Sequence, residues 1–164
     1  MALPNQGQDR GAVASKLYIG RPLVSPCPDG GGDAQVVEAF EYHVLGELWG
    51  IPRSLLENCE EIRSLLEEAV SEAGLTLFQT YVVRRKSGLI AVAVVGESHV
   101  AISTWPELGV AIVEVSSCKD SESTWEVYSK IREGLGAPEH HVIDIRSGIP
   151  LLEKLESIQM CGEA

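Results

Sequence analysis

The sequence predicts an α/β protein of the α+β kind, a two-layer sandwich in which a mainly antiparallel sheet carries helices on one face. Hydrophobic residues make up 45% of the 164 residues and charged residues 23%, which is typical of a globular chain with a core. Most of the expected strands follow one another directly with turn residues between them, which favours antiparallel pairing. Two stretches with helical spacing interrupt this series.

The first 35 residues differ from the rest of the chain. They contain four prolines and six glycines, including Gly30, Gly31 and Gly32, and they show little periodicity. We therefore expect a flexible tail over residues 1–35 and one domain over residues 36–164.

The domain is expected to open with a strand and a long helix. Residues 40–49 alternate in polarity, as a half-buried strand does, and Gly50 and Pro52 end the run. Apolar residues then recur at helical spacing from Ser54 to Ala73, and Gly74 is a common residue just past a helix end.

The remaining elements are four strands, a helix, a strand and a short helix. The strands are expected over residues 75–83, 89–95, 99–105 and 110–116, the second helix over 122–135, the last strand over 142–145 and a short helix over 151–160. A charged turn over residues 84–88 and a turn from Pro106 to Gly109 separate neighbouring strands.

Composition excludes several function classes. The net charge is −11, and no extended cluster of Lys and Arg is present to displace counterions from a phosphate backbone, so we expect no nucleic-acid partner. The longest apolar run, Leu89 to Val95, is far shorter than the ~20 residues of a membrane span, so we expect no membrane partner. No basic segment followed by an apolar one opens the chain, which predicts a cytoplasmic protein.

The four cysteines predict neither a disulfide framework nor a metal site. They are scattered, without a CxxC pair or a short Cys/His spacing: Cys27, Cys59, Cys118 and Cys161. In the cytoplasm we expect reduced thiols and no bound metal.

Three short segments are candidates for chemistry, and each has a plain structural explanation when taken alone. Glu97, Ser98 and His99 lie at a turn leading into a strand, where alternation predicts that Ser98 and His99 point to opposite faces. The pair His140–His141 has no metal-ligand spacing and is expected in an exposed loop. The segment 105–109 combines a tryptophan, a proline, a glutamate and a glycine, as a tight turn with a packed ring does.

Together these residues carry a family resemblance. The run from Gly96 to Cys118 resembles the core motif of the prokaryotic-type S-adenosylmethionine decarboxylase proenzymes, E-S-H-x-x-I-H-T-W-P-E-x-G followed by a strand and a cysteine. The resemblance covers about residues 40–148, and His43 lies where the family carries a histidine. The tail has no counterpart in the family.

The resemblance implies a self-processing, pyruvoyl-dependent enzyme of polyamine synthesis that supplies the aminopropyl donor for spermidine. The precursor, a zymogen, is cut between Glu97 and Ser98: the Ser98 hydroxyl attacks the preceding carbonyl to give an ester, and β-elimination converts Ser98 into a pyruvoyl group. That group forms a Schiff base with S-adenosylmethionine and takes up electrons as CO₂ departs. Such a site needs backbone held off its normal geometry, with which Gly96 is compatible.

The resemblance also assigns roles to further residues. Cys118 is the acid that reprotonates the substrate carbon, Glu107 binds the ribose hydroxyls, and Trp105 lies near the adenine. A homodimer is implied as well, because family members assemble their sites near a subunit interface.

The chain departs from the family pattern at two processing residues. Ser103 replaces the second motif histidine, the expected base of the elimination, and losing a positioned base typically costs about 10²–10⁴-fold in rate. Ile90 stands where the family has an assisting serine, and Ser87 is the nearest substitute. Two alternatives therefore stay open: decarboxylation of another amino acid such as arginine or ornithine, and an unprocessed homologue that binds nucleosides or regulates an active paralogue.

Overall fold

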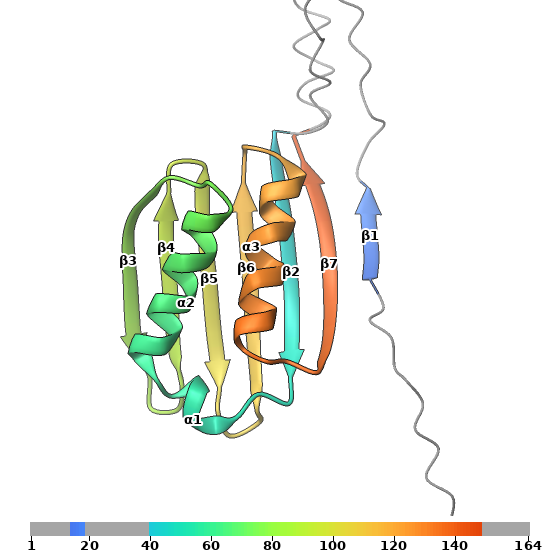
Figure 1. The fold of residues 1–164 in the computed structure, drawn as a ribbon. Helices are drawn as coiled ribbons and strands as arrows, with labels where there is room; N and C mark the ends of the chain where they lie inside the picture. Colours follow the sequence, from blue (N-terminus) through green and yellow to red (C-terminus); the bar gives the residue numbers. More distant parts are fainter. Residues whose placement is uncertain (1–13, 19–39, 149–164) are drawn as a thin grey trace, which may run out of the picture.

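The computed structural model describes residues 40–148 together with the backbone of residues 14–18 (Figure 1). In chain order the elements are β1 (Ala14–Tyr18), β2 (Glu41–Trp49), α1 (Arg53–Leu56), α2 (Cys59–Glu72), β3 (Leu77–Arg84), β4 (Leu89–Val95), β5 (Ser98–Trp105), β6 (Val110–Ser117), α3 (Ser121–Gly134) and β7 (Glu139–Ser147). The strands form one sheet in the order β1-β7-β2-β6-β5-β4-β3.

The predicted fold class is confirmed. Every neighbouring pair from β7 to β3 is antiparallel, and β1 is the one strand that pairs in parallel, at the β7 edge. Helices α2 and α3 lie side by side on one face of this sheet, so the described residues form two layers (Figure 1).

Strand β1 lies inside the segment that the sequence predicted to be a tail. Residues 14–18 pair in register with residues 142–146 of β7, from Ala14 beside Val142 to Tyr18 beside Arg146. The pairing partner is more than 120 residues away in the chain, so no local pattern in the first 35 residues announces it. The helix predicted over 151–160 lies outside the described residues.

Two local predictions need correction. The long helix expected over residues 54–73 is divided into α1 and α2, because the Asn58 side chain accepts hydrogen bonds from the backbone N–H groups of Glu60 and Glu61 and starts a new helix. His140 and His141 lie in strand β7 and not in a loop, since β7 pairs with β2 along nine residues.

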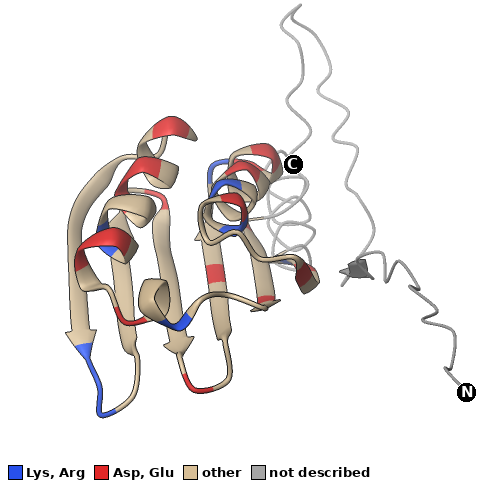
Figure 2. Cartoon of the chain, turned by 60° about the horizontal axis from the view of Figure 1, so that its bottom comes forward, with Lys and Arg blue, Asp and Glu red and all other residues tan. Residues whose placement is uncertain are grey.

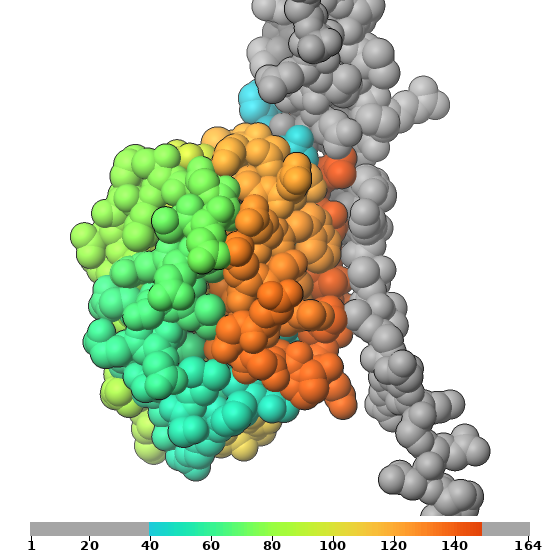
Figure 3. Space-filling view, viewed as in Figure 1, coloured from blue at the N-terminus to red at the C-terminus, as the bar shows by residue number. Residues whose placement is uncertain are grey.

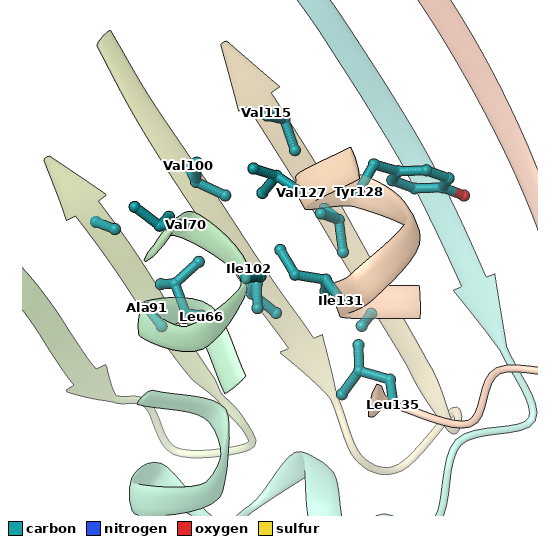
Figure 4. Packing of buried hydrophobic residues seen from close by; sticks show 14 of the residues in the cluster. Leu66, Val70, Ala91, Val100, Ile102, Val115, Val127, Tyr128, Ile131 and Leu135 are labelled. Atoms are coloured by element: carbon teal, nitrogen blue, oxygen red, sulfur yellow. The ribbon is translucent and has the colours of Figure 1, made fainter. Parts of the chain in front are cut away.

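The core lies between the helices and the sheet (Figure 4). Leu66 and Val70 of α2 and Val127 and Ile131 of α3 are fully buried against sheet residues such as Ile102. The two helices close this face of the molecule in the space-filling view (Figure 3). Tyr128 packs against β2, where a Cβ at Gly46 would lie 2.2 Å from its ring.

The opposite face of the sheet is covered by none of the described helices. Alternation along β3 and β4 directs Tyr81, Val83 and Val94 to this face, where 59%, 60% and 39% of their surfaces are exposed. Asp and Glu residues are found mainly on the helices (Figure 2). Among the described residues, no helix is long and apolar enough to cross a membrane.

Candidate active site

Ser98 adopts a strained backbone conformation at the start of β5. Its φ is +151°, and within the described residues it is the one non-glycine residue with a positive φ. A conformation of this kind costs of the order of 1–3 kcal/mol and persists only where the surroundings impose it. Here Ser98 is held between two strands, because it pairs with Val95 of β4 and Ser117 of β6.

The prediction that Ser98 and His99 lie on opposite faces of the sheet is wrong because of this backbone conformation. Ser98 Oγ lies 3.2 Å from Nδ1 of His99. A positive φ interrupts strand alternation and turns both side chains toward the helix-free face. The Nε2 atom of His99 lies 3.8 Å from Glu114 on the neighbouring strand β6.

A polar cluster surrounds the Ser98 hydroxyl, and most of its members are not apparent from the sequence. Ser98 Oγ donates a hydrogen bond of 2.8 Å to Oε1 of Glu41, and the same oxygen accepts a 2.6 Å hydrogen bond from Ser116 Oγ. Ser116 Oγ lies 3.1 Å from Nδ1 of His43, whose Nε2 lies 3.0 Å from Ser147 Oγ.

Sheet register brings these residues together. His43 of β2 lies beside Ser116 of β6, which in turn lies beside His99 of β5. Glu41 lies two positions before His43 on β2. Because side chains alternate along a strand, the two are on the same face.

The carboxylate of Glu41 is held in its ionised form. The hydrogen bond from Ser116 is the largest influence that lowers the pKa of Glu41, joined by the hydrogen bond from Ser98 and the nearby rings of His43 and His99. Partial burial opposes them, but the direction is downward. Glu41 is therefore an anionic acceptor at neutral pH.

The peptide group before Ser98 is also held on both sides. The carbonyl oxygen of Glu97 accepts a hydrogen bond of 3.0 Å from the backbone N–H of Cys118. The Glu97 carboxylate accepts hydrogen bonds from Thr76 N–H and Oγ at 2.9 and 3.1 Å, and these lower its pKa. The structure thus brings Glu97, Ser98 and Cys118 together, with the Cys118 side chain exposed.

Ser103 and Ser98 are not brought together within one chain. Ser103 lies five residues further along β5, which is about 16 Å at ~3.3 Å per residue. Its neighbours Ile102 and Thr104 are buried under the helices, so Ser103 faces the helix-free side. It pairs there with Ile90 and Ile112.

Trp105 and Glu107 lie at the other end of β5 from Ser98. Trp105 lies seven positions after Ser98 in the strand, about 23 Å away at ~3.3 Å per residue. The Arg85 guanidinium lies 4.9 Å from the centre of the Trp105 ring. Ser87 donates a hydrogen bond to the Glu107 carboxylate and thereby lowers its pKa.

Within the described residues, the remaining candidates from the sequence contact neither the polar cluster around Ser98 nor the Trp105 and Glu107 end of β5. His140 lies beside Arg132, and burial lowers its pKa. Cys59 is half-buried beside Arg84, while Cys27 and Cys161 lie outside the described residues. No three His, Cys, Asp or Glu side chains gather as a metal site would require in the part of the chain that the structure describes.

Comparison with known proteins places this arrangement in context. The family model described as S-adenosylmethionine decarboxylase matches residues 42–148. The S-adenosylmethionine decarboxylase proenzyme of Methanococcus vannielii is 34% identical over 114 residues, 69% of this chain and 93% of the relative. That of Thermosipho melanesiensis is 33% identical over 103 residues, 62% of this chain and 79% of the relative.

A solved structure agrees with the sequence relatives. The crystal structure of the adenosylmethionine decarboxylase from Aquifex aeolicus has a TM-score of 0.64 and 29% sequence identity to this chain. The superposition covers 68% of this chain and 92% of that one.

Proposed function

This chain belongs to the S-adenosylmethionine decarboxylase family and is a carboxy-lyase, and we propose that it cuts its own backbone between Glu97 and Ser98 and then decarboxylates S-adenosylmethionine. The observation that carries the proposal is the positive φ of Ser98 beside a hydroxyl held by Glu41. Strain at this peptide raises the ground state, and cleavage releases it.

The cleavage proceeds through an ester, an elimination and a hydrolysis. Ser98 Oγ bonds to the Glu97 carbonyl carbon, the C–N bond breaks, and the hydroxyl proton ends on the freed nitrogen, which leaves an ester. A base then removes the Cα proton of Ser98, and the Cβ–Oγ bond breaks. The main-chain carboxylate of Glu97 departs as the new C-terminus of the first chain. Tautomerisation and hydrolysis by water release ammonia and leave a pyruvoyl terminus.

The surroundings of the peptide suit the first step. When Oγ attacks, negative charge develops on the Glu97 carbonyl oxygen, and the Cys118 N–H already donates to that oxygen. A backbone donor aimed at a developing oxyanion stabilises the transition state without reorganisation. The Thr76 hydrogen bonds to the Glu97 side chain keep this residue in place.

The surroundings of position 98 also suit a small carbonyl group. Once formed, a pyruvoyl group would supply an electrophilic carbonyl that condenses with the substrate amine and takes up the electron pair left by CO₂. The backbone N–H of Cys118 donates a hydrogen bond to the Glu97 carbonyl oxygen, so Cys118 lies next to the cleavage site. In this proposal its exposed thiol donates the proton to the substrate carbon. The decarboxylated product carries the aminopropyl group used in spermidine synthesis, and we place the reaction in the cytoplasm.

The proposal includes a homodimer, because one chain holds the two halves of the site at opposite ends of β5. Glu107 and Trp105 are the proposed ribose and adenine contacts, yet they lie more than about 20 Å along the strand from Ser98. Two copies related by a two-fold axis, with their helix-free faces together, bring the Ser98 end of one over the Glu107 end of the other. The exposed apolar side chains of that face are then covered.

Complementation tests this shared site. A chain carrying Ser98→Ala and a chain carrying Glu107→Gln are each inactive, but a mixed dimer contains one site with both native residues. Random mixing predicts roughly a quarter of the wild-type CO₂ release, since half of the dimers are mixed and each has one intact site of two. No recovery on co-expression would contradict a site shared between copies.

The chemical activity is tested by CO₂ release from carboxyl-labelled S-adenosylmethionine. We expect release by the wild type, loss in Ser98→Ala, and a substrate adduct on the chain starting at position 98 after borohydride reduction. Release from arginine or ornithine in place of S-adenosylmethionine would support the substrate alternative. The names of the relatives, all decarboxylase proenzymes, do not favour a regulatory subunit without activity.

A further inference from the structure

Among the described residues, two side chains contact the Ser98 hydroxyl, and only one of them receives its proton. Oε1 of Glu41 lies 2.8 Å from Ser98 Oγ, and Nδ1 of His99 lies 3.2 Å away. A hydroxyl has one hydrogen to donate, and an ionised carboxylate can only accept. The hydrogen therefore points to Glu41, and the contact with His99 makes Ser98 Oγ an acceptor.

A chain of donors fixes the Glu41 carboxylate in this position. Ser116, which is fully buried, donates to the same oxygen at 2.6 Å. Because its single proton goes to Glu41, Ser116 Oγ accepts at His43, so Nδ1 of His43 carries a hydrogen. Glu41 lies at the end of this chain, with its Oε1 between two hydroxyl groups.

Within one chain, the residue at the position of the family's motif histidine does not reach the Ser98 hydroxyl. Ser103 is about 16 Å along the strand from Ser98, at ~3.3 Å per residue, and a serine hydroxyl is a poor base at neutral pH. Within the chain, the proton acceptors available to Ser98 are the residues that contact its hydroxyl, Glu41 and His99.

We propose that Glu41 is a catalytic residue of the self-cleavage and takes the Ser98 hydroxyl proton as Oγ attacks the Glu97 carbonyl carbon. Glu41 returns this proton to the Ser98 nitrogen as the C–N bond breaks, so the step neither gains nor loses a proton. Because its pKa is lowered, Glu41 is ionised at neutral pH and so carries no proton before the attack. This inference rests on the proposed self-cleavage.

The test compares Glu41→Gln with Glu47→Gln in the full chain. Glu47 is the matched control, since it lies on the same strand and the same face but is exposed and six residues from Glu41. Chains made by cell-free translation are followed by intact mass. We expect Glu41→Gln to slow cleavage by about 10²–10⁴-fold, the usual contribution of a positioned base, and Glu47→Gln to match the wild type.

A chemical rescue keeps the test valid if Glu41→Gln perturbs the fold. In Glu41→Ala a small carboxylate can enter the space that the side chain leaves. We expect added formate to accelerate cleavage of Glu41→Ala in proportion to its concentration and to leave the wild type unchanged. A purely structural role for Glu41 predicts no formate dependence.

Hydroxylamine separates the two steps, because it cleaves an ester quickly and an amide hardly at all. If Glu41 acts in the attack, Glu41→Gln forms no ester and stays resistant. Cleavage of Glu41→Gln by hydroxylamine at the wild-type rate would assign Glu41 to a later step and overturn the inference. Normal self-cleavage of Glu41→Gln would overturn it while leaving the proposed function intact. A wild type that neither cleaves nor reacts with hydroxylamine would overturn both.

Discussion

Replacing Ser98 by glycine and by alanine measures the strain at the cleavage site directly. Both variants lack the hydroxyl, so neither can cut itself and both lose the same hydrogen bonds to Glu41 and His99. They differ only in the Cβ atom, which makes the φ of +151° costly for alanine and acceptable for glycine.

The magnitude follows from two opposing terms. Relief of the strained φ favours glycine by about 1–3 kcal/mol. The extra entropy of an unfolded glycine favours alanine by about 0.5–1 kcal/mol. The free energy of unfolding of Ser98→Gly should therefore exceed that of Ser98→Ala by about 1 kcal/mol, the difference between those two ranges.

Equilibrium unfolding in urea at one protein concentration provides the assay, with equal slopes as the condition for comparing midpoints. Ala101→Gly added to the uncut Ser98→Ala chain, on the same strand at a regular position, is the control and should lose about 0.5–1 kcal/mol. If Ser98→Gly is no more stable than Ser98→Ala, the peptide stores no strain and that part of the account fails.

Three further changes test the packing and the site. Tyr128→Phe should stabilise the fold by up to about 1 kcal/mol in urea unfolding, because the buried Tyr128 hydroxyl has no hydrogen-bond partner among the described residues. Burial also raises the pKa of Tyr128 to about 12, so this tyrosine ionises at a lower pH in the unfolded state than in the folded state. The wild type should therefore lose stability more steeply than Tyr128→Phe as the pH rises above 10. Parallel stability profiles of the two proteins would contradict this. Gly46→Ala should destabilise by about 1–3 kcal/mol, since its Cβ would lie 2.2 Å from the Tyr128 ring, and an unchanged midpoint would show that the ring moves freely. Cys118→Ala should still cut itself, because the backbone N–H remains, but should release CO₂ about 10²–10⁴-fold more slowly; an uncut chain would instead give the thiol a part in cleavage.

Local patterns predicted most of the sheet and one end of the long helix. Gly74, with a φ of +66°, follows the C-cap of α2 as its position in the sequence indicates. Strand length was harder to predict, because β7 is set by nine residues of pairing with β2 and not by its own polarity pattern. The break before α2 depends on one Asn58 side chain inside an otherwise continuous apolar pattern.

The candidate site was only partly visible in the sequence, for a physical reason. Glu41 and Ser116 lie 57 and 18 residues from Ser98, and only the order β2-β6-β5 in the sheet makes them neighbours. Alternation shows that residues 41 and 43 share a face, but it does not show which strand lies beside them. The contact between Ser98 and His99 likewise depends on a positive φ that no regular strand pattern predicts.

The intact mass of the full chain under denaturing conditions tests self-cleavage most directly. We expect two chains, residues 1–97 and 98–164, the second with a pyruvoyl group in place of its terminal serine. A single uncut chain of 164 residues, unchanged after prolonged incubation and after addition of putrescine, would contradict it.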